Sequence, residues 1–160
     1  NLDGSIVLAT MEGARPLLVE IQALVNPTNF GYPKRTASGF DLNRLNLLVA
    51  VLEKRTKLKL ADKDIYVNVV GGLKLNDPAA DLAVAMAIAS ASAGRSLDEG
   101  AVVFGEIGLG GEIRSAMNWQ ARIKEAKKLG FTYAIAPKVH KDKFIKGVSD
   151  MRQALIDYLQ

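Results

Sequence analysis

The segment that begins at Asp77-Pro78 constrains the fold of this chain more than any other part of the sequence. Asp77 is a residue type that caps helices, and Pro78 suits the first helical position because the N–H that it lacks needs no partner there. The helix that follows, to about Ala91, consists mostly of alanine, valine, isoleucine and methionine. A helix that is apolar on nearly every side is buried. The sequence therefore predicts a domain built around a central helix.

Strand-like and helix-like patterns alternate along the rest of the chain. They predict strands at residues 5–10, 15–25, 65–70, 101–107, 112–115 and 133–136, helices at 42–56 and 150–159, and a third helix from Trp119 that Gly130 ends. A basic loop, residues 31–39, and a polar connector, residues 138–147, lie between them. This interleaving favours an α/β (or α+β) two-layer fold. At 160 residues we expect one domain, 1–160, with its core at about residues 5–137.

Composition excludes several kinds of function. The chain has no cysteine, which rules out disulfides, zinc clusters and thiol catalysis within it, and its one histidine, His140, cannot form a multi-histidine metal site. We expect His140 in a surface loop just after a strand. No apolar run could span a membrane and no secretion signal opens the chain, which favours a cytoplasmic protein. Because the chain starts at Asn1, we expect a domain excised from a longer protein.

Basic residues near the first long helix are the strongest candidates for a binding site. The formal net charge of +4 permits an anionic partner. Lys34, Arg35 and Arg44 occupy the basic loop and the first helical turn, with Phe30 and Tyr32 beside them. Cations and aromatic rings in this pattern are typical of surfaces that contact phosphates and stack on bases. A solvated loop is the alternative, although Arg44 opposes the helix dipole and a stabilising role for it is weakly supported.

The other charged residues have simpler explanations. Asp77 and Asp81 lie four residues apart and could form an acid pair, but an N-cap and a first-turn acid explain them better. One basic set favours a solvated outer helix face and consists of Arg122, Lys124, Lys127 and Lys128. A second set suits the negative end of the first long helix and consists of Lys54, Arg55, Lys57 and Lys59.

The glycines and the single tryptophan favour structural roles. Gly71-Gly72 and the glycines between residues 105 and 111 lack the spacing of a phosphate-binding loop, so we expect tight turns and no nucleotide there. Trp119 shares a helical face with Ile123 and Ala126, which is typical of an anchor in a core or an interface.

Two segments, residues 71–81 and 105–114, resemble the active-site segments of the Lon protease proteolytic domain. The resemblance assigns the position of the nucleophilic serine to Ala79 and that of the general-base lysine to Gln120. An alanine has no nucleophile and a glutamine amide cannot take a proton from one, so we expect no catalysis by this domain. A peptidase with a relocated dyad stays open as an alternative. Its candidate serines are Ser38, Ser90, Ser92 and Ser115.

Nearly the whole chain, from about Ser5 to Leu159, resembles the C-terminal Lon-like domain of the bacterial RadA (Sms) family. The matching segments are residues 11–25, 35–39, 52–55, 66–72, 77–83 and 103–109. The resemblance implies a Lon-type α/β fold, related to the ribosomal protein domain-2-like fold. It also implies DNA repair and recombination by a hexameric, DNA-dependent ATPase. ATP, magnesium and a zinc finger would belong to domains absent from this chain, which would itself hold no cofactor or metal.

These observations together give a hypothesis for the function. The chain would be a non-catalytic domain that helps to form a hexameric ring and contacts single-stranded or branched DNA without sequence preference. Lys34, Arg35 and Arg44 would contact the phosphates, and copies arranged around a ring would add their weak contacts. Two alternatives stay open: an oligomerisation scaffold that does not bind DNA, and a serine peptidase with a relocated dyad.

Overall fold

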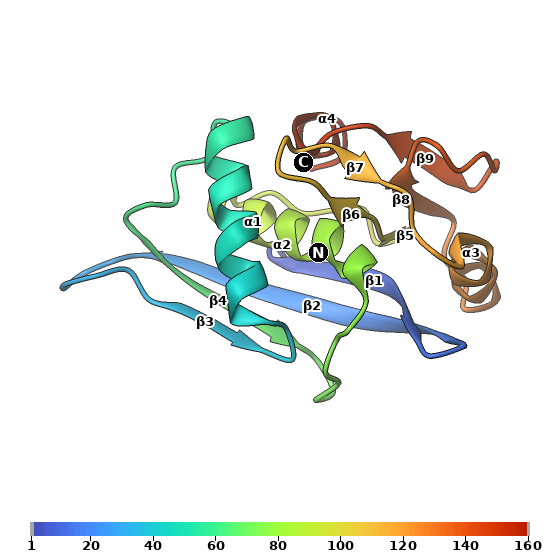
Figure 1. The fold of residues 1–160 in the computed structure, drawn as a ribbon, viewed down its shortest axis with the longest axis horizontal. Helices are drawn as coiled ribbons and strands as arrows, with labels where there is room; N and C mark the ends of the chain where they lie inside the picture. The colour runs from blue at the N-terminus through green and yellow to red at the C-terminus, as the bar shows by residue number, and fades with distance from the viewer. Residues whose placement is uncertain (1, 160) are drawn as a thin grey trace.

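The computed structural model describes residues 2–159, which form a mixed α/β domain (Figure 1). In chain order the elements are β1 (Ser5–Glu12), β2 (Arg15–Pro27), β3 (Arg35–Ser38), α1 (Leu42–Arg55), β4 (Lys63–Val69), the 3-10 helix η1 (Pro78–Ala80), α2 (Asp81–Ala93), β5 (Ala101–Val103), β6 (Glu106–Ile107), β7 (Ile113–Arg114), α3 (Trp119–Lys128), β8 (Tyr133–Pro137), β9 (Ile145–Val148) and α4 (Met151–Tyr158). The interleaved pattern in the sequence is therefore confirmed as an α/β fold. None of the helices within residues 2–159 is long and apolar enough to cross a membrane.

Seven strands form one sheet in the order β3-β4-β2-β1-β5-β8-β9, and β6 pairs with β7 separately. The long strands β1 and β2 form an antiparallel hairpin, and β4 is antiparallel to β2. The remaining neighbours in the large sheet are parallel. Short parallel strands therefore flank an antiparallel centre, and β3 and β9 are the two edges of the sheet.

Helices cover one half of the sheet more completely than the other. Leu8 and Ala9 are consecutive in β1 and point to opposite faces, yet both are fully buried, so both faces of the sheet are covered there. In the half formed by β3, β4 and β2, the alternate residues Gln22 and Asn68 are exposed. That half is covered on one face only, which is common in antiparallel sheets.

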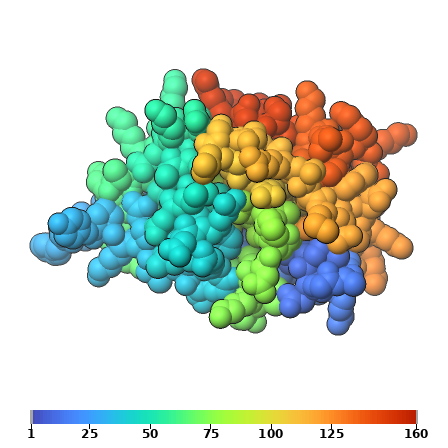
Figure 2. All heavy atoms as spheres, viewed as in Figure 1, coloured from blue at the N-terminus to red at the C-terminus, as the bar shows by residue number. Residues whose placement is uncertain are grey.

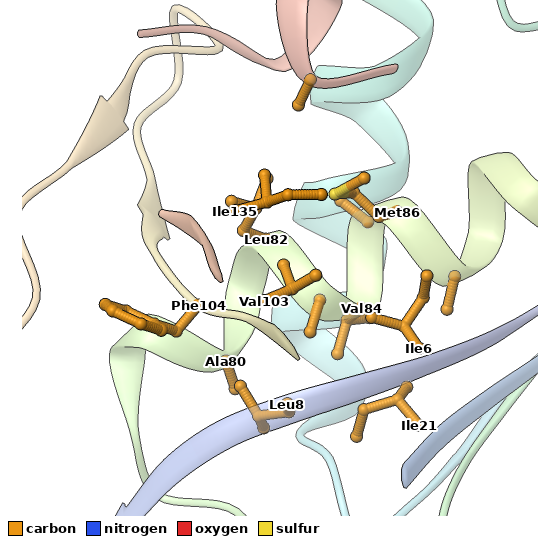
Figure 3. Packing of buried hydrophobic residues seen from close by; sticks show 14 of the residues in the cluster. Ile6, Leu8, Ile21, Ala80, Leu82, Val84, Met86, Val103, Phe104 and Ile135 are labelled. Carbon is orange, nitrogen blue, oxygen red and sulfur yellow. The ribbon is translucent and has the colours of Figure 1, made fainter. Parts of the chain in front are cut away.

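The predicted central helix is confirmed. Every residue of α2 from Asp81 to Ser90 is buried, and Gly94 ends the helix in the left-handed conformation. Figure 3 shows Leu82, Val84 and Met86 of α2 packed among side chains of the sheet. The helix has no polar side because α1, α4 and the sheet surround it. Its first turn, η1, is a 3-10 helix rather than α-helix.

Two segments that the sequence left as loops contain short strands. The basic loop holds β3, which pairs in parallel with β4, and the polar connector runs into β9, which pairs with β8. Both are edge strands. The partner of β3 is distant in the sequence, and the partner of β9 is separated from it by the connector. Buried residues also continue beyond the expected limit of the core at residue 137. They include Phe144, Val148, Met151, Ala154 and Leu159.

The predicted strand at residues 101–107 is two strands in two sheets. After β5 the chain leaves the large sheet, because the backbone N–H of Gly105 donates to the carbonyl of Ala79 and its own carbonyl accepts from Leu82 N–H. These bonds, at 2.8 and 2.9 Å, attach the chain to the start of α2. Strand β6 then pairs with β7, and the two strands stand beside that helix start.

Candidate functional site

A groove lies at the start of α2, where the resemblance assigns the protease active site; we call it the α2 groove. It has two adjoining parts of about 270 and 400 Å³. Residues shared by both parts are Asn76, Asp77, Pro78 and Glu106. Ala79 lines the smaller part and is 3% exposed. The groove at this position therefore presents a methyl group and no nucleophile.

Asp77 binds the strand hairpin as well as its own helix. Its carboxylate accepts from the backbone N–H of Ala79 at 3.0 Å, which confirms the predicted cap. It also accepts from the hydroxyl of Thr10 at 2.9 Å and from Met11 N–H at 3.2 Å. The wall of the groove is thereby fixed to β1.

Arg122 is the buried partner of Asp77, and its predicted place on a solvated outer face is wrong. Its side chain is 2% exposed and forms an ion pair with Asp77. It also donates to the carbonyls of Ala9 and Met117, each at 3.0 Å. Burial alone raises the pKa of Asp77, but hydrogen bonding and the charge of Arg122 outweigh burial and hold that pKa below its ordinary value. The guanidinium of Arg122 thus connects Asp77 and the segment before α3 to β1.

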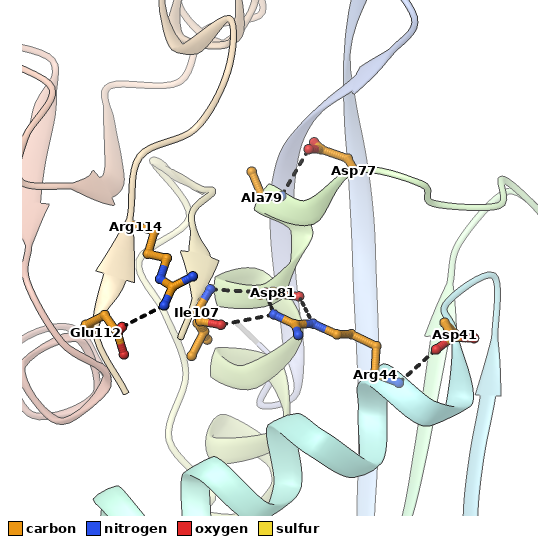
Figure 4. Close-up of polar contacts among 8 residues, drawn as sticks. All are labelled: Asp41, Arg44, Asp77, Ala79, Asp81, Ile107, Glu112 and Arg114. Carbon is orange, nitrogen blue, oxygen red and sulfur yellow. Dashed lines mark hydrogen bonds and ion pairs between the residues drawn. The ribbon is translucent and has the colours of Figure 1, made fainter. Parts of the chain in front are cut away.

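Arg44 and Asp81 form a second ion pair at the other part of the groove (Figure 4). The Nε of Arg44 donates to Asp81 Oδ1 at 2.9 Å, and its terminal nitrogen also donates to the carbonyl of Ile107 at 3.0 Å. Hydrogen bonding to Asp81 raises the pKa of Arg44. The acid-pair alternative for Asp77 and Asp81 is therefore wrong, because each carboxylate binds its own arginine. The expectation that Arg44 has little stabilising role is also wrong.

Gln120 does not line the groove. It is exposed on α3, whereas Asn118 and Arg122 contribute from that segment. Asn118, which precedes α3, has a φ of 56° and is the one non-glycine residue with positive φ among residues 2–159. Of the four candidate serines, Ser115 lines the groove. Ser90 is buried at the far end of α2, where its hydroxyl binds the carbonyl of Arg95.

The glycine-rich turn between β6 and β7 encloses a carboxylate of its own chain. Glu112 accepts from the backbone N–H of Gly110 at 2.9 Å and from Arg114 at 3.0 Å. A Cβ added at Gly108 would lie 2.3 Å from this carboxylate, so a larger residue there would displace the Glu112 side chain. The prediction of a tight turn is confirmed, and an internal anion occupies it.

Lys34 and Arg35 lie at the β2–β3 connection, which projects at one end of the molecule (Figure 1). Lys34 is exposed, and so are Phe30 and Tyr32, at 90% and 92%. The guanidinium of Arg35 donates to the carbonyl of Leu60 at 2.8 Å, which brings the connection beside the loop after α1. The structure therefore groups Lys34 and Arg35 with that loop, whereas Arg44 lines the α2 groove.

The loop after α1 contributes further cations to this end. Lys57 and Lys59 are exposed there, directly before Leu60. The last turn of α1 contributes Lys54 and Arg55, which suit the negative end of the helix dipole as predicted. The sequence had assigned these residues no partner. Their nearness to Lys34 depends on the Arg35–Leu60 bond, which residue spacing could not reveal.

His140 lies in the loop after strand β8 as predicted, but it is partly buried rather than fully exposed. Its ring stacks on Trp119 with centroids 4.9 Å apart, and its Nε2 accepts from the backbone N–H of Ala116 at 2.9 Å. Burial, followed by the charge of Arg122, lowers the pKa of His140. Trp119 is thus an anchor for the segment that lines the groove. Within residues 2–159, no group of three or more His, Cys, Asp or Glu residues could hold a metal ion.

Along more than half of its length, this α/β chain matches a known protein family. The family described as subunit ChlI of Mg-chelatase matches residues 44–140, which include most of α1 and all of α2 and α3. The chain therefore belongs to that family.

Relatives along nearly the whole chain are more specific. The chain is 46% identical over 159 residues to the DNA repair protein RadA of Bacillus subtilis, covering 95% of this chain and 35% of the relative. It is 52% identical over 134 residues to RadA of Halalkalibacterium halodurans, and 50% identical over 138 residues to RadA of Rickettsia bellii. Those matches cover 84% and 86% of this chain, and 29% and 31% of the relatives. The chain thus spans about a third of the length of these curated relatives, and the predicted resemblance to RadA proteins is confirmed.

Proposed function

We propose that this chain is a non-catalytic, Lon-like domain of a RadA-type DNA repair protein, which contacts DNA phosphates and helps subunits to form a ring. The similarity to proteins named DNA repair protein RadA supports the biological setting. Sites for ATP, magnesium and zinc are assigned to parts of such a protein outside this chain.

The absence of catalysis is supported by the contents of the α2 groove. Ala79 stands where a nucleophile is needed, and Gln120 is exposed on α3 and does not line the groove. The buried charges beside Ala79 are already paired with each other, so Arg122 and Asp77 have no free group to act as a base. Ser115 is the serine of the relocated-dyad alternative that lines this groove. A serine-reactive probe that labelled Ser115 specifically would overturn the non-catalytic proposal.

The observation that carries the DNA contact is the projecting β2–β3 connection. Phe30 and Tyr32 are almost fully exposed, and Lys34 follows them. Exposed rings beside cations suit nucleic acid, because bases stack on the rings while the cations contact phosphates. Lys34 is the most accessible of the three predicted contacts. Arg35 is held by Leu60, and Arg44 would have to share its guanidinium with Asp81.

The test is fluorescence anisotropy of labelled single- and double-stranded DNA across a salt series, with mass measured by light scattering in the same buffers. Binding should weaken log-linearly with salt, and Lys34→Ala should lower both affinity and slope. The matched control is Lys74→Ala, which removes one exposed lysine away from the connection. Arg35→Ala should have a smaller effect than Lys34→Ala, and Arg44→Ala the smallest.

An unchanged affinity and salt slope in Lys34→Ala and Arg35→Ala would exclude DNA contact by these residues. A stable oligomer with no DNA binding at low salt would instead favour the assembly scaffold. Binding that appears only in the oligomer would support a ring whose copies add their separate contacts, because linked sites bind far more tightly than single ones.

A further inference from the structure

The positive charge of the chain is divided between two segments. Residues 34–63 contain eight basic and three acidic residues, and residues 124–146 contain seven lysines and two acids, so each segment has a net charge of +5. Because the whole chain has a net charge of +4, the remaining residues together carry −6. The basic character of the chain is therefore confined to these two segments, and only the first includes the predicted contacts Lys34, Arg35 and Arg44.

The lysines of the second segment lie on α3 and on the β8–β9 connector with the start of β9, and we call them together the connector surface. Its members are Lys124, Lys127, Lys128, Lys138, Lys141, Lys143 and Lys146, and all seven are exposed. Lys127 of α3 reaches the β8–β9 connector, where its Nζ lies 3.7 Å from Asp142 and 5.3 Å from the ring centroid of Phe144. The stack of His140 on Trp119 joins the same two segments nearer the start of α3. Lysines from the helix and from the connector are thus adjacent.

The backbone beneath these lysines is fixed. The side-chain carboxylate of Asp142 accepts from Phe144 N–H at 2.8 Å, and the backbone carbonyl of Asp142 accepts from Ile145 N–H at 3.0 Å. His140 N–H donates to the carbonyl of Pro137 at 3.1 Å. At Gly147 a Cβ would come 2.8 Å from Lys138 Cα, so β9 packs closely on the start of the connector. Lysines on a fixed backbone lose less freedom on binding than lysines on a loose loop.

Most of this charge is not neutralised by the protein. Among residues 2–159, Lys127 is the one member of the surface with an ion pair, and its side chain remains 52% exposed. The two acids of the segment are Glu125 and Asp142, and Asp142 already binds the connector backbone. Within residues 2–159 the other six lysines have no ion pair, so their solvent counterions can be released when a polyanion binds.

The two basic segments stand at opposite ends of the molecule. In Figure 1, whose horizontal direction is the longest axis, the β2–β3 connection lies at one end, and α3 with the β8–β9 connector lies at the other. The space-filling view shows the same separation, with the α2 region between the β2–β3 connection and α3 (Figure 2). Outside the two segments the chain is net acidic, so its basic character is not spread over the rest of the sequence.

We propose that the connector surface is a second contact site for DNA phosphates, and that one copy of this domain holds two DNA segments at once. The second site is independent of the proposed function, whereas bridging rests on DNA contact at the β2–β3 connection as well. The site reads no sequence, because lysines that contact only phosphates carry no sequence information.

The test uses two short duplexes, one with a donor fluorophore and one with an acceptor, and measures energy transfer between them when protein is added. The connector variant is Lys138→Gln, Lys141→Gln and Lys143→Gln, and the opposite-end variant is Lys34→Gln, Lys57→Gln and Lys59→Gln. The control variant removes three exposed charges elsewhere: Lys74→Gln, Arg95→Gln and Arg152→Gln. Circular dichroism checks folding, and light scattering identifies any transfer that depends on protein dimers.

The wild type should bring the duplexes together, and the connector variant should lose the transfer while it still binds one duplex. Its salt slope should fall by about 0.9 for each phosphate that it no longer neutralises. The control should keep the transfer. A connector variant that matches the control in both transfer and slope would overturn the second site. If only the connector variant loses affinity for DNA, the connector surface is a DNA contact site. The proposed contact at the β2–β3 connection is then wrong, and so is the proposal that one copy bridges two DNA segments.

Discussion

The α2 groove and the two basic ends use charge in opposite ways. In the groove, Arg122 and Arg44 are held against Asp77 and Asp81, and the carboxylates are almost completely buried. At the ends, Lys34 and Lys141 are exposed to solvent. A buried pair stabilises the fold through its own partner and has no capacity left for another, whereas an exposed cation exchanges counterions freely. The comparison teaches that burial, and not the number of basic residues, decides which charges can recognise a ligand.

The largest expected effect is the loss of the groove cation. Arg122→Ala leaves the carboxylate of Asp77 buried without its partner, so the free energy of unfolding should fall by about 3–5 kcal/mol. Urea unfolding followed by circular dichroism measures it. Lys124→Ala, on the same helix but exposed, should change it by less than about 0.5 kcal/mol. Equal losses in the two variants would contradict the contrast between groove and ends.

The next effect depends on pH. Because the pKa of Asp77 is lowered in the folded chain, its ionised form contributes stability above the unfolded value, near about 3.9, and loses it as pH falls through the folded value. Asp77→Asn should therefore destabilise the chain at pH 7 by about 2 kcal/mol, and the difference from wild type should shrink below pH 4. Denaturant unfolding at each pH measures this. The exposed Asp62→Asn should show a small, flat difference, and a flat difference for Asp77→Asn would refute the assignment.

A smaller effect is expected at the edge of the groove. The lowered pKa of His140 means that the folded chain favours the neutral ring, so stability should be full above about pH 6.5 and decline as pH falls from there towards the folded pKa. His140→Phe keeps an aromatic ring beside Trp119 but leaves Ala116 N–H without its acceptor, at a cost of about 1–3 kcal/mol. The fluorescence emission of Trp119, followed during unfolding at each pH, measures both the pH dependence of stability and the cost of the substitution. In His140→Phe the unfolding curve should no longer depend on pH below about 6.5 through this group, and an unchanged dependence would exclude His140 as its source.

The smallest effect on stability is expected at a basic end. Lys57→Gln with Lys59→Gln removes two exposed charges and should leave the free energy of unfolding within about 0.5 kcal/mol of wild type. The same variant should weaken DNA binding and reduce its salt slope. A stability loss as large as that of an Arg122 variant would show that this end, too, is structural.

Local signals predicted much of the fold. Asp77 is a cap as its residue type predicted, and the all-apolar run predicted the burial of α2, because each of these depends on neighbouring residues only. Strands β3 and β9 were missed because an edge strand of four residues is fixed by its pairing partner rather than by its own pattern.

The candidate site was less accessible to sequence reasoning. Arg122 lies three residues after Trp119 and four before Ala126, which places it on the buried face of α3. The sequence nevertheless predicted the solvent-exposed face for it, because arginine side chains are usually exposed. Its partner is 45 residues away, and Arg44 and Asp81 are 37 apart, so no spacing could pair them. Ala79 lines the groove, whereas its assignment to the nucleophile position and the roles of Lys34 and Arg35 remain predictions.

The contacts of Arg122 also affect the order in which parts of the domain can fold. The groups that it joins, on Ala9, Asp77 and Met117, come from three separate parts of the chain, and Arg122 follows all of them. During synthesis, the hairpin of β1 and β2 and the helix α2 emerge first, and the carboxylate of Asp77 then lacks its counter-charge. Burying it before Arg122 arrives would be costly. The central helix therefore docks fully only when α3 has been made, so this half of the domain assembles late and as one unit.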